Sequence, residues 1–171
     1  LDVIFVVDAS GSMKSNDPEG IALEMVKAFV DTIHADDISV GFVAYNDKIV
    51  SASIPITMAE QVNRENLKDL IDTTIYSGNT DIGLGLTEAY KSLQISGDKN
   101  SMIGLISDGA TELRGSTTGR NDDTQGEDVA EVIRHWQDQT IPAVIIAFGP
   151  HRGDAGDLQP NTKSISDVHY V

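Results

Sequence analysis

Short apolar runs rich in β-branched residues alternate along the chain with longer segments in which apolar residues recur at helical spacing. Such runs predict strands that are buried on both faces, and three of them are Leu1–Val7, Met102–Ile106 and Ala143–Phe148. Two further runs, Ser39–Tyr45 and Lys48–Ile54, flank a two-residue turn signal, Asn-Asp. This pair predicts an antiparallel hairpin.

Four segments between the strands predict helices. The first helix is predicted to start with Asp17 as its N-cap and Pro18 at its first helical position. Thr57 and Glu60 predict a capping box before the second helix. The helices' expected apolar faces are Ile21, Ala22, Met25, Val26, Phe29, Val30 and Ile33; Leu67, Leu70 and Ile71; Ile82, Leu86, Ala89, Tyr90 and Leu93; and Val129, Val132, Ile133 and Trp136.

Alternation of strands and helices predicts a doubly wound, mostly parallel α/β sheet with helices on both faces and one antiparallel strand at an edge. Leu113–Gly126 is polar and contains glycine, which predicts a surface loop with Asn121-Asp122-Asp123 as its solvated tip. His169–Val171 is read as a last strand. We expect one domain over residues 1–171, cut from a larger protein and lacking a closing helix.

Charge and composition narrow the class of partner. The net charge is −15, from 27 acidic against 12 basic residues, which disfavours nucleic acid and anionic membranes as partners. No apolar run approaches the ~18 residues that span a bilayer. The absence of cysteine excludes disulfides, thiolate zinc sites and cysteine nucleophiles. Most of the acidic residues are expected to form a solvated surface.

The segment Asp8-Ala9-Ser10-Gly11-Ser12 stands directly after the first predicted strand. Open α/β sheets bind ligands beyond the carboxyl ends of their strands. One carboxylate and two hydroxyls on a short turn present oxygen atoms there, and Gly11 permits a tight backbone. Taken alone, this segment would more often be a turn or a helix cap than a metal site.

Two more segments are expected at the same edge: Gly78-Asn79-Thr80-Asp81 before the third helix, and Ser107-Asp108-Gly109 after the central strand. Hydroxyl and carboxylate oxygens from three segments suit a hard cation such as Mg²⁺. Asp8 and Asp108 would repel each other without a cation between them. The sequence therefore predicts one divalent cation held by Asp8, Ser10, Ser12, Thr80 and Asp108, with a coordination position left open.

This pattern resembles the metal-ion-dependent adhesion site of the von Willebrand factor A family, and the resemblance covers nearly the whole chain. It implies that Ser10, Ser12 and Thr80 coordinate the ion directly, and that Asp8 and Asp108 do so directly or through water. The ion would be Mg²⁺, Mn²⁺ or Ca²⁺. The missing closing helix and the absence of the flanking cysteines that are common in animal members point to a bacterial type of domain.

Residues beside the predicted ligands have two readings each. Asp81 either accepts a hydrogen bond behind the ligands or caps the third helix, and Asn79 either lines the site or shapes the turn. Met13 is expected to pack the loop rather than touch a ligand, and Gly109 lies at the rim. Gly83 and Gly85 are expected to let the third helix pack close to the sheet. Trp136 is expected in the core, and the four histidines lack metal-ligand spacing.

The sequence is compatible with three functions. The first is a metal-dependent adhesion module that binds a protein partner, whose acidic side chain completes the coordination of the ion, at the surface of a bacterium. The second is a domain of the same family that works with an ATPase in a chelatase-like assembly inside the cell, which would place it in the cytoplasm. The third, an enzyme, is disfavoured: Ser10 stands where a phosphohydrolase needs a second acid, Leu105 breaks the Gly-x-Ser-x-Gly motif, and a Walker loop is absent.

Overall fold

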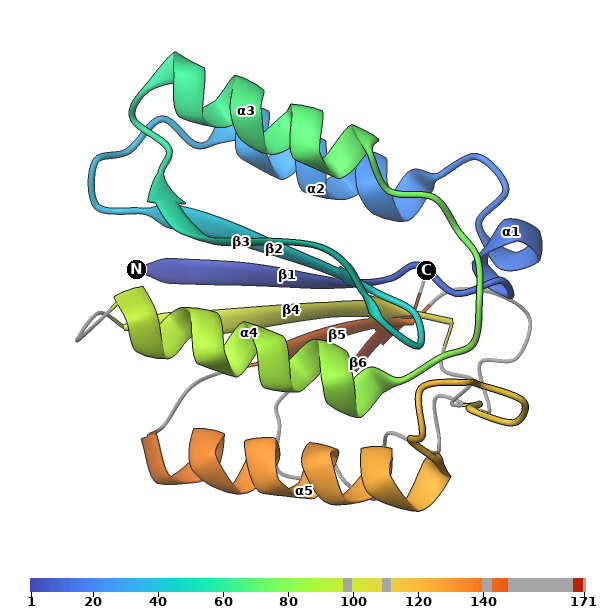
Figure 1. The fold of residues 1–171 in the computed structure, drawn as a ribbon. Helices are drawn as coiled ribbons and strands as arrows, with labels where there is room; N and C mark the ends of the chain where they lie inside the picture. Colours follow the sequence, from blue (N-terminus) through green and yellow to red (C-terminus); the bar gives the residue numbers. More distant parts are fainter. Residues whose placement is uncertain (97–99, 109–111, 140–142, 148–167, 171) are drawn as a thin grey trace.

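The computed structural model shows a central sheet between two layers of helices (Figure 1). It describes residues 1–171 except 97–99, 109–111, 140–142, 148–167 and 171. Helices α2 (Ile21–Thr32) and α3 (Gln61–Asp72) cover one face, and α4 (Ile82–Ser96) and α5 (Asp122–Gln139) lie on the other. The short helix α1 (Met13–Asn16) lies at one end of the sheet. The predicted doubly wound fold is confirmed.

The described strands form one sheet in the order β3-β2-β1-β4-β5-β6. All neighbours pair in parallel except β2 and β3, which form the predicted antiparallel hairpin and place β3 at an edge. The strands are β1 (Asp2–Asp8), β2 (Ser39–Tyr45), β3 (Ile49–Thr57), β4 (Ser101–Ser107), β5 (Ala143–Ala147) and β6 (Val168–Tyr170). The carboxyl ends of β1, β4 and β2 therefore meet at one edge of the sheet.

Alternate residues of the central strands feed two separate apolar cores, as buried strands with period two require. Ile4 and Val6 of β1 belong to the core under α4 and α5. Val3 and Val7 belong to the core under α2 and α3. Gly85 of α4 lies so close to the sheet that a Cβ there would be 2.4 Å from the ring of Tyr45, which confirms the close packing predicted for this glycine.

Two predicted helix starts are wrong. Helix α2 begins at Ile21, not Pro18, and its N-cap position is Gly20, in the left-handed region with φ of 70°. The carboxylate of Asp17 nevertheless accepts hydrogen bonds from the backbone N–H groups of Ile21 and Ala22, at 2.6 and 2.9 Å. Thr57 caps nothing in α3, because β3 extends to Thr57 and pairs it with Ser39.

The predicted loop Leu113–Gly126 is also too long. Helix α5 already begins at Asp122, and the side chain of Asn121 accepts a hydrogen bond from the backbone N–H of Thr124 at 2.9 Å. Asn121 is thus a helix cap rather than a loop tip. Val129 and Val132 are buried as predicted, whereas the side chains of Ile133 and Trp136 lie outside the described residues.

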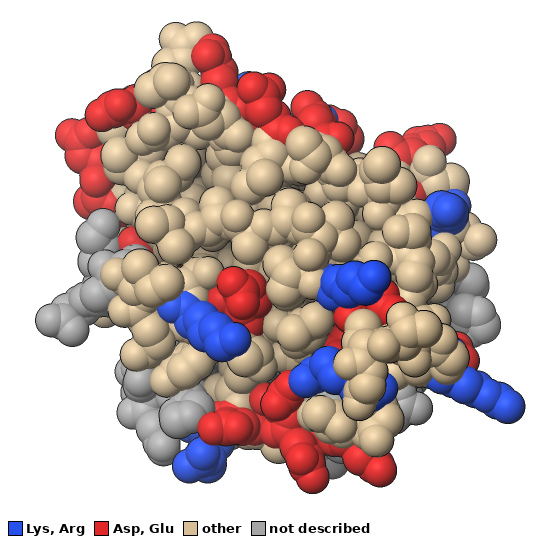
Figure 2. Space-filling model, viewed as in Figure 1, with Lys and Arg blue, Asp and Glu red and all other residues tan. Residues whose placement is uncertain are grey.

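Acidic side chains lie on both helical layers. Figure 2 shows Asp and Glu side chains along the edge formed by α2 and α3. A polar groove there is lined by Glu24, Lys27, Asp31, Glu65, Lys68, Asp69 and Asp72. Its lysines are paired with acids, Lys27 with Asp72 at 2.7 Å and Lys68 with Asp31 at 2.6 Å. Among the described residues, no helix is long and apolar enough to cross a bilayer.

Candidate metal site

The turn after β1 is bound directly to the segment between α3 and α4. The backbone N–H of Ser77 donates to the carbonyl of Ala9 at 2.7 Å, and that of Gly11 donates to the carbonyl of Gly78 at 2.9 Å. The second contact needs glycine: a Cβ on Gly11 would lie 3.2 Å from the Gly78 carbonyl, and Gly78 has a φ of 79°. Two of the three predicted site segments are therefore in contact at the carboxyl edge of the sheet (Figure 1).

Asp8 is the last residue of β1 and is fully buried. One carboxylate oxygen accepts the backbone N–H of Ser10 at 2.8 Å, and the other accepts the hydroxyl of Ser107 at 2.7 Å. Burial and then the nearby charge of Asp108 raise the pKa of Asp8 to about 7, against the opposing effect of these hydrogen bonds. Among the described residues, hydroxyl and backbone groups donate to Asp8, and no lysine or arginine forms an ion pair with it.

The hydroxyls of Ser10 and Ser12 lie beside Asp8. Their oxygen atoms are 3.0 Å apart. Ser10 is buried, whereas Ser12 is exposed, so the pair reaches from the buried carboxylate to the surface. Two oxygen atoms at this separation suit neighbouring ligands of one cation.

Asp108 follows β4, next to β1 in the sheet, and is buried. Its carboxylate accepts a hydrogen bond from the side-chain amide of Asn16 at 2.9 Å, which fixes it against helix α1. The charge of Asp108 is close enough to Asp8 to raise the pKa of that residue. The two carboxylates therefore lie near one another at the carboxyl edge of the sheet.

Thr80 is buried in the turn before α4. Its backbone forms an isolated antiparallel bridge with Glu112, with N–H to O distances of 2.8 and 3.2 Å. The next residue, Asp81, donates its backbone N–H to the carbonyl of Asn46, which follows β2. Thr80 is thereby fixed at the same edge as the Asp8 turn.

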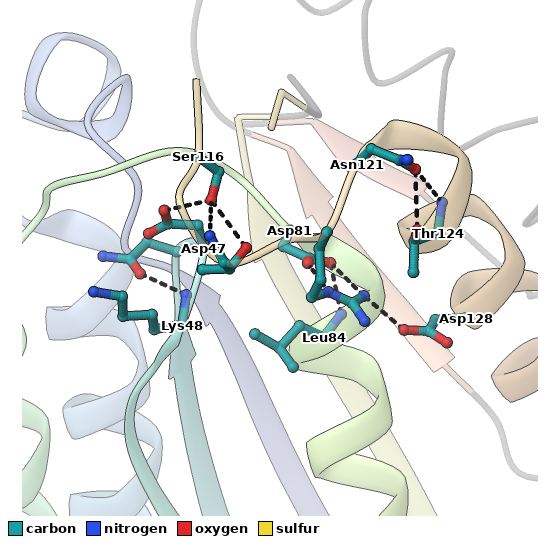
Figure 3. Close-up of polar contacts among 11 residues, drawn as sticks. Asp47, Lys48, Asp81, Leu84, Ser116, Asn121, Thr124 and Asp128 are labelled. Carbon is teal, nitrogen blue, oxygen red and sulfur yellow. Dashed lines mark hydrogen bonds and ion pairs between the residues drawn. The ribbon is translucent and has the colours of Figure 1, made fainter. Parts of the chain in front are cut away.

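The side chain of Asp81 caps helix α4 and binds an arginine. Its carboxylate accepts the backbone N–H of Leu84 at 2.9 Å and forms a two-pronged ion pair with Arg120 (Figure 3). Of the two readings left open by the sequence, the structure thus shows helix capping. Met13 is fully buried within the core under α2 and α3, in keeping with loop packing. Asn79 is half-buried, and Gly109 lies outside the described residues.

Four residues near the site were not singled out as site residues from the sequence. Ser107 and Asn16 hold the carboxylates of Asp8 and Asp108. Tyr45 ends β2 beside Asp8, and burial and the Asp8 charge raise the pKa of its hydroxyl well above the usual value. Arg120 reaches Asp81 from 39 positions further along the chain. Only Ser107 had a local signal, since it lies within the strand-end motif Ser-Asp-Gly.

The predicted donor set has the chemistry that suits a hard divalent cation. It consists of two carboxylates and three hydroxyls, and such oxygen donors suit Mg²⁺, Mn²⁺ and Ca²⁺. Within the described part of the chain, no group of three or more His, Cys, Asp and Glu side chains is arranged to hold a metal. A site here would consequently need the serine and threonine hydroxyls as ligands.

The chain is thus a doubly wound α/β domain with buried carboxylates and serine hydroxyls at the carboxyl edge of its sheet, the edge at which such sheets bind ligands. The chain belongs to the von Willebrand factor type A domain family, whose model matches residues 2–166. It is also 32% identical over 121 residues to the human voltage-dependent calcium channel subunit alpha-2/delta-4, which covers 65% of this chain and 10% of that protein.

Solved structures share the fold. A von Willebrand factor type A protein from Catenulispora acidiphila matches with a TM-score of 0.73 and 19% identity, covering 99% of this chain and 38% of that one. The pilus adhesin SpaC from Lactobacillus rhamnosus GG gives 0.72 and 15%, covering 98% and 27%. The manganese-loaded TRAP protein of Plasmodium vivax gives 0.68 and 13%, covering 100% and 68%. The chain thus spans about a tenth of the curated relative and about a third of the two bacterial proteins.

Proposed function

We propose that this domain holds one divalent cation through Asp8, Ser10, Ser12, Thr80 and Asp108, and uses it to bind an acidic side chain of a protein partner. The observation that carries the proposal is the buried pair Asp8 and Asp108 at the edge of the sheet. Burial and the nearby charge of Asp108 raise the free energy of ionised Asp8, which has no lysine or arginine partner among the described residues. A dication would remove that cost.

The chemistry of the bound ion is that of a Lewis acid which accepts a carboxylate oxygen. The chain's own residues would hold the ion and orient its ligands. Ser107 and the backbone of Ser10 orient Asp8, and Asn16 orients Asp108. Ser12, the exposed member of the set, lies on the solvent side, where a partner would approach.

Relatives support an adhesion role over catalysis. One structural neighbour is named a pilus adhesin, and another is a minor pilin from Streptococcus sanguinis. The Plasmodium neighbour is described as loaded with manganese. We therefore propose a non-enzymatic module that acts at a cell surface, with Mg²⁺ or Mn²⁺ as the working ion.

Isothermal titration with MnCl₂ and MgCl₂ tests the metal site. We expect one site per chain in the wild type and none in Asp8→Ala. The matched control is Asp36→Asn, which removes one acidic charge from an exposed residue before β2, at the opposite end of the sheet. Equal loss in the control, or the absence of binding in the wild type, would refute the site.

Water-proton relaxation of the Mn²⁺-loaded protein tests the open coordination position. Bound Mn²⁺ should enhance relaxation through exchanging water, and a Gly-Gly-Glu-Gly-Gly peptide should lower that enhancement by replacing the water. The same peptide with Gln in place of Glu should have no effect. Equal effects of the two peptides would remove the role of the acidic side chain.

A further inference from the structure

The segment between β4 and α5 is bound to the edge of the sheet at several points (Figure 3). Glu112 pairs with Thr80 through two backbone hydrogen bonds. The hydroxyl of Ser116 donates to the carboxylate of Asp47, in the turn between β2 and β3, at 2.9 Å. This segment therefore contacts both the turn that carries Thr80 and the end of the antiparallel hairpin.

Arg120 makes the strongest of these attachments. Nε donates to one oxygen of Asp81, and Nη2 donates to the other at 3.1 Å. Nη2 also donates to Asp128, on the second turn of α5, at 2.6 Å. A guanidinium that engages a carboxylate with two nitrogens fixes direction as well as distance, which a lysine ammonium does not. Arg120 thus joins the start of α4 to α5.

Asp81 is fully buried, and its two oxygens are satisfied by Arg120 and the backbone N–H of Leu84. Without Arg120, its charge would lie buried and uncompensated one peptide bond from Thr80. A carboxylate in that state turns toward water or toward the nearest cation. The position of the Thr80 turn consequently depends on Arg120.

We propose that Arg120 is a positioning residue for the metal site: it holds the Thr80–Asp81 turn in place and keeps Asp81 out of the ligand set. Through Asp128, the same side chain links the geometry of the site to the position of α5. The inference rests on the proposed function, because it concerns the same cation. A purely structural ion pair would affect stability alone and leave metal affinity unchanged.

Arg120→Lys separates geometry from charge, since the net charge near the ion is unaltered. We expect Mn²⁺ affinity to fall about fivefold by isothermal titration, a change typical of residues that act on a ligand indirectly. The matched control is Arg134→Lys, on an exposed side chain of α5 whose only described pairing is a 3.9 Å contact with Glu131. Affinity of Arg120→Lys within twofold of wild type would overturn the proposal.

Hydrogen exchange distinguishes local loosening from general destabilisation. In Arg120→Lys, the amides of Thr80 and Glu112 should exchange faster, while the amides of Val3–Val7 in β1 should keep their wild-type rates. A uniform acceleration of both sets would instead mark a structural ion pair and refute the positioning role.

Asp128→Asn provides a second test if Arg120→Lys does not fold. It weakens the link from Arg120 to α5 and leaves the pair with Asp81 intact. We expect Mn²⁺ affinity to fall about threefold, and unchanged affinity would overturn the coupling to α5. The two proposals fail in different ways. If the wild type does not bind Mn²⁺, the proposed function fails. If the variants bind Mn²⁺ as tightly as the wild type does, only the role of Arg120 fails.

Discussion

Two aspartates at the carboxyl edge of the sheet, Asp8 and Asp81, are both fully buried but are surrounded differently. Asp81 has a guanidinium on both oxygens and caps a helix. Asp8 has a serine hydroxyl, a backbone amide and a second carboxylate nearby. The protein compensates one buried charge itself and leaves the other without a basic group in the part of the chain that the structure describes.

The difference teaches how structural and binding carboxylates can be told apart. A buried charge with an arginine partner needs no ligand and contributes to the fold. A buried charge whose neighbours include a like charge favours its protonated form or a bound cation. Residue type alone does not separate the two, because both are aspartates at the end of a strand or turn. Their partners separate them.

Asp8→Asn should have the largest effect on binding. Asn keeps the size of the side chain but removes the charge, so we expect Mn²⁺ affinity to fall at least about a hundredfold, or about 2.8 kcal/mol. Metal-free stability at neutral pH should be unchanged or higher, since repulsion from Asp108 is relieved. Isothermal titration and thermal unfolding in EDTA measure the two quantities. A large loss of metal-free stability would show that Asp8 is structural, like Asp81.

Asp81→Asn should show the reverse pattern. One of the two oxygens that accept from Arg120 becomes an amide NH2 and the negative charge is lost, so we expect the free energy of unfolding to fall by about 2 kcal/mol. Mn²⁺ binding should remain measurable, within about tenfold of wild type. Urea unfolding gives the first value, and the exposed Asp36→Asn control should change it by less than about 0.5 kcal/mol. Complete loss of Mn²⁺ binding without loss of stability would place Asp81 among the ligands.

The pH dependence of metal affinity follows from the pKa of Asp8, which is raised to about 7. If Asp8 is a ligand as proposed, protons compete with the ion for its carboxylate below that value, and affinity should fall roughly twentyfold between about pH 7.5 and about pH 5.5. The sign for metal-free stability is opposite: the contribution of Asp8 is present below its ordinary pKa of 3.8 and is lost as the pH rises through about 7.

Titrations at a series of pH values measure the first effect. The difference in unfolding temperature between Asp8→Asn and the metal-free wild type measures the second, because other carboxylates cancel in that difference. The variant should gain stability relative to wild type as the pH rises from about 4 to about 7. If this difference does not vary with pH, the charge of Asp8 is compensated by other groups in the metal-free protein, and the raised pKa is wrong.

Much of the fold was predictable because its signals are local. Buried strands show as apolar runs, and helix faces show as apolar residues at helical spacing; Val26 and Val30 of α2 are buried as their spacing predicted. The strand order then brings Asp8 and Asp108 together, because β1 and β4 are parallel neighbours. The prediction that both lie at one edge needed only the general rule for open α/β sheets.

The parts that failed depend on contacts distant in sequence or on competing local structures. Thr57 matched a capping box, but pairing with Ser39 takes that residue into the sheet. Asn121 and Asp122 are polar, so they resemble a loop, although Asn121 caps a helix whose apolar face begins later. Arg120 had no signal, because its partner Asp81 lies 39 positions earlier and nothing in the sequence states that they meet.

Asp17 extends the comparison, since it is a buried carboxylate held by neutral donors alone among the bonds described. It accepts the hydroxyl of Tyr76 at 2.7 Å as well as two backbone N–H groups of α2. Burial and the bond to Asp17 raise the pKa of Tyr76, so its hydroxyl remains a donor at neutral pH. Asp17 therefore has neutral donors, as Asp8 has, but like Asp81 it accepts backbone N–H groups at the start of a helix.

Tyr76→Phe should have the smallest effect of the four changes. It removes one hydrogen bond to a carboxylate that keeps two others, so the free energy of unfolding should fall by about 1 kcal/mol in urea. Mn²⁺ affinity should change less than twofold, because the Ser77–Ala9 and Gly11–Gly78 backbone bonds still hold the two turns together. A drop in affinity comparable to that of Asp8→Asn would mean that Asp17 and the ion share one network, and the division between structural and binding carboxylates would not hold at this edge.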